Sequence, residues 1–265
     1  MYLAVICFLG LVNGQFTSIT DLSKYPFYFS EGGRNWTGEC ATGTRQSPID
    51  LVNTIDRPVT LVTDSSLAFI LTTSSHAFQV YEHYGLLLYQ GQASLEGLYN
   101  GTEFEGSLFQ FHVHAPADHL VDGVRYPLEL HVAFPPSNNS TDLQAVIVGF
   151  FFQEGQANPV LQAMIDLRSV DLSLLLPPGG VIDDYIAYIG SRGAPLPDCV
   201  EPQLYIFPNY ILEASPEQVA YWTDRYVTDL SFSNGRGDVR DIQPLNGRTI
   251  SHIVPEANSV ISFLS

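Results

Sequence analysis

The sequence predicts a mainly β protein, a single domain built on a large, twisted, mostly antiparallel central sheet with a few peripheral helices. Short runs rich in β-branched and aromatic residues recur along the chain, and turn residues separate most of them. No repeat, low-complexity stretch or linker rich in Pro, Gly and Ser divides the 265 residues. The runs that we interpret as strands are Val59–Val62, Ala68–Leu71, Phe78–Tyr81, Leu86–Tyr89, Leu108–His114, Leu128–Phe134, Ala145–Phe152 and Leu204–Phe207.

Two segments carry the signals of helices. From Asn158 to Val170, apolar residues recur near helical spacing after an Asn-Pro start. At Ser215-Pro-Glu-Gln218, Ser stands at the N-cap, Pro at the first helical position and Glu in the first turn, which is a strong signal for a helix start. Many strands and few helices indicate a domain dominated by its sheet.

Composition and charge exclude several classes of protein. Apolar residues make up 45% of the chain and charged residues 15%, which excludes a disordered or collagen-like protein. The chain has 11 Lys and Arg against 28 Asp and Glu, for a formal net charge of -17. Because a protein that neutralises phosphates needs the opposite sign, we expect neither nucleic acid nor an anionic membrane surface as a partner.

The N-terminus predicts secretion. The apolar run from Tyr2 to Val12 is too short to span a bilayer, and small residues end it at Gly14. We interpret residues 1–14 as a signal peptide and residues 15–265 as the mature domain, although no basic residue precedes the run. The alternative is a buried first strand. No later run is long enough for a membrane span.

Cysteines and glycosylation motifs suit a secreted protein. Cys7 would leave with the signal peptide, so that Cys40 and Cys199 remain. These two form either one disulfide, which closes a loop of about 160 residues, or two buried free thiols. Four Asn-X-Ser/Thr motifs are candidate glycosylation sites, of which the last two overlap: Asn35, Asn100, Asn138 and Asn139.

Three histidines fall together on a predicted hairpin. Side chains alternate between the faces of a strand, so His112 and His114 share one face of the run that ends at His114. A hairpin turn signal, Asp122-Gly123, brings His131 of the next run beside them. A lone His on a strand is usually structural, but three neutral imidazoles with an open fourth position are what zinc requires. Polar neighbours on the same faces, placed to fix the ring tautomers, are Gln110 and Glu129.

Around these histidines the sequence resembles the alpha-class carbonic anhydrases. The segment FHVHAPADHLVDGVRYPLELH, Phe111–His131, is similar to the zinc-site hairpin of that family, in the short form of its bacterial, plant and protist members. Further segments resemble family motifs in chain order, so the resemblance covers roughly residues 28–248. They are GTRQSPID (Gly43–Asp50), SHAF (Ser75–Phe78), SPEQV (Ser215–Val219) and QPLNGR (Gln243–Arg248).

The resemblance implies a role for each matched residue. Zn²⁺ would be bound by His112, His114 and His131, with Gln110 and Glu129 holding the first and third rings. His76 would be the proton shuttle, which suits a side chain that titrates near neutral pH. The resemblance further implies an apolar pocket for carbon dioxide at Ala133, Ile147 and Tyr205, and the single disulfide of secreted members at Cys40 and Cys199.

One part of the family pattern is missing. The family places Ser-Leu-Thr-Thr-Pro-Pro before the second disulfide cysteine, and its first Thr, paired with a Glu, orients the hydroxide that attacks carbon dioxide. This chain reads GSRGAPLPDC from Gly190 to Cys199, with no Thr and about one residue out of register. Ser191 lies too early to replace the Thr, and Asp118 stands in place of the Glu. We expect Arg192 either to reach the pocket that the family keeps apolar or to face solvent.

These observations leave two functions open. The first is a secreted zinc lyase, a carbonic anhydrase that interconverts carbon dioxide and bicarbonate with reduced turnover. The alternative is a weak or inactive carbonic-anhydrase-like zinc domain that serves as an extracellular binding or matrix protein, for which the adhesion-type tripeptide Arg236-Gly-Asp238 is the only sequence feature. The retained ligands, their polar neighbours and His76 favour the enzyme.

Overall fold

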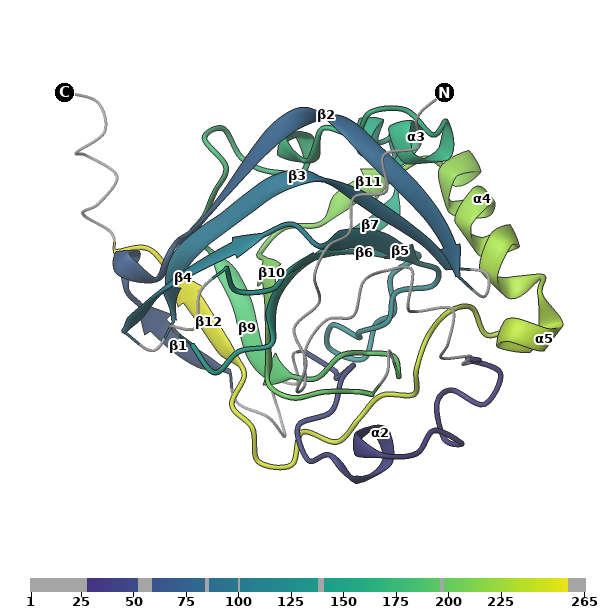
Figure 1. Ribbon diagram of the computed structural model, residues 1–265, viewed down its shortest axis with the longest axis horizontal. Coiled ribbons are helices and arrows are strands. Elements are labelled where there is room, and N and C mark those ends of the chain that lie inside the picture. Colours follow the sequence, from purple (N-terminus) through teal and green to yellow (C-terminus); the bar gives the residue numbers. More distant parts are fainter. Residues whose placement is uncertain are drawn as a thin grey trace, which may run out of the picture.

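Strands dominate the computed structural model of the protein (Figure 1), which describes residues 28–51, 59–83, 86–99, 101–137, 141–195 and 198–256. For Ser65 and for residues 74–83 and 86–87 it describes the backbone alone. The strands of the described part are β1 (Thr60–Thr63), β2 (Phe69–His83), β3 (Leu86–Tyr99), β4 (Thr102–Ser107), β5 (Gln110–His114), β6 (Leu128–Phe134), β7 (Ala145–Glu154), β8 (Val181–Ile182), β9 (Tyr185–Gly190), β10 (Gln203–Pro208), β11 (Leu212–Ala214) and β12 (Ser251–Val254).

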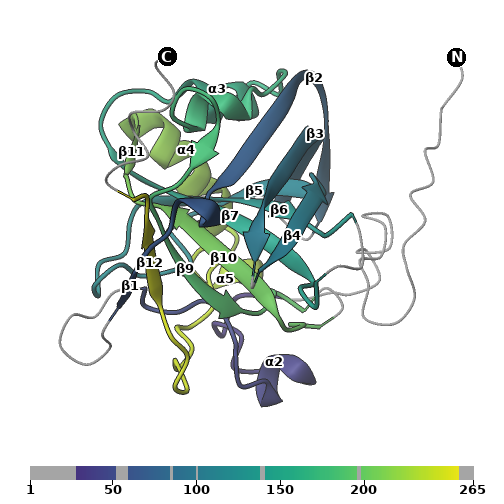
Figure 2. The same ribbon diagram turned by 90° about the vertical axis from the view of Figure 1, so that its left-hand side faces the viewer.

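These strands form one curled sheet, which the two views show from perpendicular directions (Figures 1 and 2). Its order is β1-β12-β9-β10-β7-β6-β5-β3-β2-β8, with β11 beside β7 and β4 beside β3. Most neighbours are antiparallel, while β1 with β12 and β7 with both β10 and β11 are parallel. The predicted mainly β fold on a large, mostly antiparallel sheet is confirmed.

The strand predictions differ from the structure in three respects. The strand expected over Leu86–Tyr89 continues to Tyr99 as β3. The runs Ala68–Leu71 and Phe78–Tyr81, expected as two strands, fall, except for Ala68, in one long strand, β2. The pairing of β2 with β3 shifts register between Ser74 and Gln79. The strands β4, β8, β9, β11 and β12 were not predicted. They are two to six residues long, and the sheet neighbours rather than a local hydrophobic pattern determine them.

Helices are few and peripheral, and α3, α4 and α5 lie together at one side of the sheet (Figure 1). Within the described residues the α-helices are α2 (Glu39–Thr42), α3 (Pro159–Ile165), α4 (Pro216–Val227) and α5 (Leu230–Ser233), and short 3-10 turns occupy Ser65–Leu67 and Leu172–Leu175. Both predicted helix starts are present, because Asn158 caps α3 and Ser215 forms a capping box with Gln218 in α4. The helix predicted to reach Val170 ends at Ile165, and Leu167 turns into the left-handed region at φ 53°.

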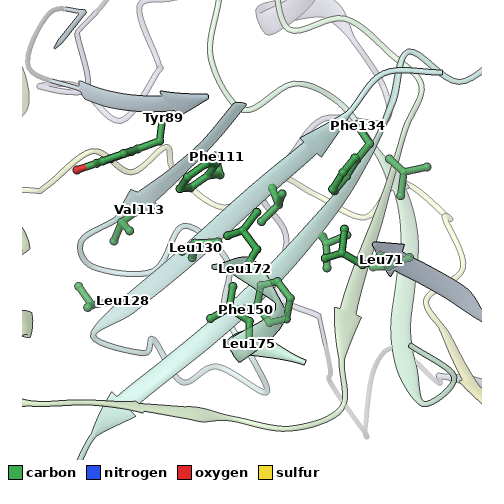
Figure 3. Close-up of a cluster of buried hydrophobic side chains, with 14 of the residues drawn as sticks. Leu71, Tyr89, Phe111, Val113, Leu128, Leu130, Phe134, Phe150, Leu172 and Leu175 are labelled. Atoms are coloured by element: carbon green, nitrogen blue, oxygen red, sulfur yellow. The ribbon is translucent and has the colours of Figure 1, made fainter. Parts of the chain in front are cut away.

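Alternation along the central strands gives the sheet two different faces. On one face, Phe111, Leu130 and Phe150 belong to the main hydrophobic core, together with buried residues of other elements such as Leu71 and Leu175 (Figure 3). Each fully buried side chain of this size stabilises the fold by about 1.5–3 kcal/mol. The opposite face of β5 and β6 therefore carries Gln110, the three histidines, Glu129 and Ala133.

A disulfide ties the N-terminal region to the chain before β10. Cys40 in α2 is bonded to Cys199, 159 residues away, so the alternative of two free thiols was wrong. Asp198 strengthens the junction, because its carboxylate accepts hydrogen bonds from the backbone of Glu39 at 3.0 Å and of Cys40 at 3.1 Å. The disulfide and the hydrogen bonds to Asp198 together hold the segment that leads into the motif Gly43–Asp50.

Candidate metal centre

The two strands that carry the histidines pair in regular antiparallel register. His112 lies opposite His131, and His114 lies opposite Glu129, without a bulge or slip. The predicted turn is present, because Asp122 and Gly123 have φ angles of 51° and 77° and close a bridge between Val121 and Val124. Strand pairing alone thus brings the three imidazoles onto one patch of the sheet.

The three rings are close enough to share one ion. Their centroids are 4.7 Å apart for His112 and His114, 4.8 Å for His114 and His131, and 5.4 Å for His112 and His131. One nitrogen from each ring can be chosen so that all three lie within 4.8 Å of one another. His114 and His131 are buried, and His112 is half-buried, so the patch is still open on one side.

Each ring has its own hydrogen-bond acceptor on the side away from the patch. Nδ1 of His112 donates to Oε1 of Gln110 at 2.8 Å, and Nε2 of His131 donates to Glu129. Nδ1 of His114 donates to the backbone carbonyl of Asp238 at 2.9 Å. The nitrogens that remain for a ligand are therefore Nε2 of His112, Nε2 of His114 and Nδ1 of His131.

These contacts fit a divalent metal. Nε2 of His112 and Nε2 of His114 are 3.0 Å apart, and with both Nδ1 atoms protonated their lone pairs face each other. Such a pair is stable only with positive charge between the rings, either a proton or a metal ion. Burial lowers the pKa of His114, but Asp238 outweighs it and raises that pKa to about 10, so His114 is the ring that holds a proton when no metal is bound. Three imidazoles with an open fourth position match the ligand set of a catalytic zinc site.

A buried carboxylate holds the third ring. Burial alone would raise the pKa of Glu129, but the charges and hydrogen bonds of His119 and His131 hold that pKa well below its usual range. Glu129 therefore stays ionised and accepts hydrogen bonds from the backbone N–H of His119 at 2.8 Å and from its Nδ1 at 2.7 Å. Nε2 of His119 continues the chain to the hydroxyl of Tyr188 at 2.6 Å, which contacts Oγ of Ser47 at 2.7 Å.

The residue that holds His114, which is Asp238, was not predicted from the sequence. Asp238 is fully buried, with Oδ2 3.0 Å from Nδ1 of His114, and its Oδ1 accepts a hydrogen bond from the backbone of Ala115 at 2.9 Å. Gly237 permits this approach, because a Cβ there would lie 2.1 Å from the carbonyl oxygen of Ala115. Arg236 pairs with Asp241. The tripeptide that suggested adhesion is therefore packed against the histidine site, and its Asp is not displayed.

The three predicted pocket residues lie side by side next to the histidines. Ala133 of β6 pairs with Ile147 of β7, and Ile147 pairs with Tyr205 of β10. All three are buried in a second, smaller apolar cluster, and the Tyr205 ring lies 5.7 Å from the ring of His131. The structure thus places an apolar wall beside the candidate metal position.

The structure identifies which residue faces Asp118. Oδ1 of Asp118 accepts a hydrogen bond from the backbone N–H of Arg240 at 3.0 Å. A Cβ built on Gly193 would lie 3.4 Å from the other oxygen, Oδ2. The hydroxyl of Ser191 instead accepts a hydrogen bond from the backbone of Ser47 at 3.0 Å. Gly193 therefore occupies the position from which a hydroxyl would meet Asp118, and Ser191 does not.

The remaining predicted residues are only partly described. The backbone of His76 lies in β2, but its side chain is outside the described residues, so its role as a shuttle stays a prediction. Asn35 is exposed, whereas Asn100, Asn138 and Asn139 lie outside the described residues. Arg192 is half-buried, and burial lowers the pKa of its guanidinium to about 10, so it remains a cation.

A curled β sheet with three converging imidazoles on one face and an apolar wall beside them defines a β protein with a candidate metal centre. The model of the eukaryotic-type carbonic anhydrase family matches residues 31–254, and the chain belongs to that family. The chain is 30% identical to a carbonic anhydrase of Pectobacterium carotovorum over 228 residues, which cover 80% of this chain and 82% of the relative. It is 28% identical to carbonic anhydrase Nec1 of Nesocodon mauritianus, over 80% of this chain and 76% of the relative.

A solved structure supports the same fold. The alpha-carbonic anhydrase of Thermovibrio ammonificans, in complex with the inhibitor sulfanilamide, matches with a TM-score of 0.61 and 25% identity, over 80% of this chain and 89% of that chain. Within the described part of this chain, no helix has both the length and the apolar character to cross a membrane.

Proposed function

We propose that the protein is a secreted, zinc-dependent carbonic anhydrase, which converts carbon dioxide and water into bicarbonate and a proton with reduced turnover. The observation that carries this proposal is the set of three converging imidazoles, each with its own acceptor behind it. When bound, zinc would supply a hydroxide nucleophile near neutral pH. The residues that would hold it are His112, His114 and His131.

The surrounding residues support that chemistry. Gln110, Glu129 and the carbonyl of Asp238 fix the tautomers, so that each ring presents a free nitrogen lone pair to the metal. The wall formed by Ala133, Ile147 and Tyr205 excludes water from one side of the site and suits an apolar substrate such as carbon dioxide. His76 on β2 would take up the product proton and release it to buffer.

Reduced turnover is proposed because, in the part of the chain that the structure describes, no side-chain hydroxyl is found opposite Oδ2 of Asp118. Gly193 has no side chain, and the nearest alternative, Ser191, is bonded to Ser47. Without a positioned acceptor, the nucleophile points at the substrate only part of the time. Loss of one positioned hydrogen-bonding group commonly costs about 10²–10³ in rate.

Secretion is supported by two described features. The protein contains a Cys40–Cys199 disulfide, which is typical of an oxidising compartment, and Asn35 of the first glycosylation motif is exposed. The proposed signal peptide spans residues 1–14. The full chain is expressed in a secreting host, and the N-terminus of the secreted product is sequenced. Retention of the protein inside the cell, or of residues 1–14 on the secreted product, would contradict the proposal.

The activity is tested by stopped-flow measurement of carbon dioxide hydration with the zinc-loaded protein. We expect hydration that depends on zinc, that a chelator abolishes and that a sulfonamide inhibits. Zinc content is measured on the same sample, with one zinc per chain expected. A protein that holds zinc but shows no hydration would favour the alternative, a carbonic-anhydrase-like binding protein, although the buried Asp238 removes the adhesion motif as its support.

A further inference from the structure

A small space lies beside Asp118 at the position of Gly193. A Cβ built there would meet Oδ2 of Asp118 at 3.4 Å and, apart from the two flanking residues, no other atom of the described residues within 4 Å. Gly193 is itself half-buried, so the space is reachable from solvent. It therefore offers room for one or two heavy atoms directly in front of a carboxylate oxygen.

Asp118 has one oxygen to offer to a ligand. Its side chain belongs to the buried polar group, with 2% of the residue exposed, and Oδ1 is used by the backbone N–H of Arg240. Among the described residues, Oδ2 has no hydrogen-bond partner. Oδ2 is not one of the fully buried polar atoms that lack a partner, so it is reached through the space, and a hydrogen-bond donor that enters there would meet a charged acceptor.

The space adjoins the candidate metal centre. The loop that carries Asp238 and Arg240 contacts both sites, since Asp238 accepts from His114 and Arg240 donates to Asp118. Asp118 directly precedes His119, whose ring lies 5.7 Å from the ring of His131 and 5.1 Å from the ring of Tyr205 in the apolar wall. A molecule bound to a metal on the histidines can therefore extend toward Asp118.

We propose that the space at Gly193 is a subsite for the hydroxyl group of a small α-hydroxy carboxylate, which binds the metal through its carboxylate and donates its hydroxyl hydrogen to Oδ2 of Asp118. This inference rests on the proposed zinc site. A hydroxyl fits because Asp118 repels a second carboxylate, whereas a neutral hydroxyl can donate its hydrogen to Oδ2. A hydrogen bond from a neutral donor to a buried carboxylate is among the stronger hydrogen bonds in proteins.

Acetate and glycolate, which differ by one hydroxyl, are the probes. Titration calorimetry with the zinc-loaded protein should give a dissociation constant about 10-fold lower for glycolate than for acetate, as expected for one hydrogen bond to a charged acceptor. Gly193→Ala fills the space and keeps Asp118, and it should make the two affinities equal. Asp118→Asn keeps an oxygen for Arg240, and it should reduce the preference of the protein for glycolate over acetate.

Asp122→Asn is the matched control, because it removes the same charge from an exposed turn and replaces a residue at φ 51° by one that tolerates that conformation. It should keep the full preference, and thermal melting of each variant monitors folding. Equal binding of the two acids to the wild type, or no binding of either, would overturn the subsite, as would an unchanged preference in Gly193→Ala. Hydration activity and zinc content of the same wild-type sample report on the proposed function separately.

Discussion

Restoring a hydroxyl opposite Asp118 should accelerate the proposed reaction. In Gly193→Thr, the new Cβ would stand 3.4 Å from Oδ2 of Asp118, an ordinary van der Waals contact. The Thr hydroxyl oxygen, about 1.4 Å from that Cβ, can then reach the 2.5–3.0 Å of an O–H···O hydrogen bond. Apart from the two flanking residues, no other atom of the described part of the chain lies within 4 Å of the new Cβ.

The expected gain follows from the role of such a group. Because the Thr would donate to Asp118, its oxygen would be left as an acceptor that orients the nucleophile. Restoring one positioned hydrogen bond is worth about 10²–10³ in kcat, or about 2.7–4 kcal/mol. Gly193→Ala adds the volume without the hydroxyl and should show no gain, while Asp118→Glu in the Thr background tests whether a longer partner adds more.

Stopped-flow hydration at high buffer concentration measures the effect, because the chemical step then limits the rate. Equal rates for Gly193→Thr and Gly193→Ala would refute the reasoning. A wild-type kcat/KM already near the diffusion ceiling of about 10⁸ M⁻¹s⁻¹ would refute it as well. In that case, another group orients the nucleophile.

Three further predictions concern the metal, the crosslink and the shuttle. His114→Ala should lower zinc affinity by more than the roughly 10–100-fold that loss of an outer partner causes, and full zinc retention in metal analysis would contradict the ligand assignment. Replacing Cys40 and Cys199 by Ser should lower the free energy of unfolding by about 5 kcal/mol in the chain-entropy model, as measured by urea unfolding against the oxidised wild type. His76→Ala should change turnover little at high or at low buffer, because the unoriented nucleophile limits the rate; a large loss at low buffer alone would show that proton transfer limits it instead.

The ligand-bearing part of the fold was predictable because its determinants are local. His112 and His114 are two residues apart on one strand, and the turn at Asp122 and Gly123 brings His131 beside them. Alternation of apolar and polar residues then fixes which face each side chain occupies. Strand pairing and side-chain direction together account for the three imidazoles and for two of their acceptors.

The acceptor for His114 was not predictable in this way. Asp238 lies 124 residues along the chain from that ring, and no spacing rule connects the two. The contact depends on the close approach that Gly237 permits, which is a property of the packed loop. The same holds for Gly193 and Asp118. The segment before Cys199 is about one residue out of register with the family pattern, so only the backbone shows that Gly193 is the residue that faces Asp118.

The hydrogen-bonded chain from His131 through Glu129, His119 and Tyr188 to Ser47 has a consequence for fragments of the protein. The β5–β6 hairpin contains every imidazole of the centre, yet Tyr188, Ser47 and the loop at Asp238 come from distant parts of the chain. A hairpin excised by itself would keep Gln110 and Glu129, but His114 would lose its acceptor at Asp238 and the chain that holds Glu129 would end at His119. Preorganisation of the centre is thus a property of the completed fold, and metal affinity reports on tertiary structure far from the metal.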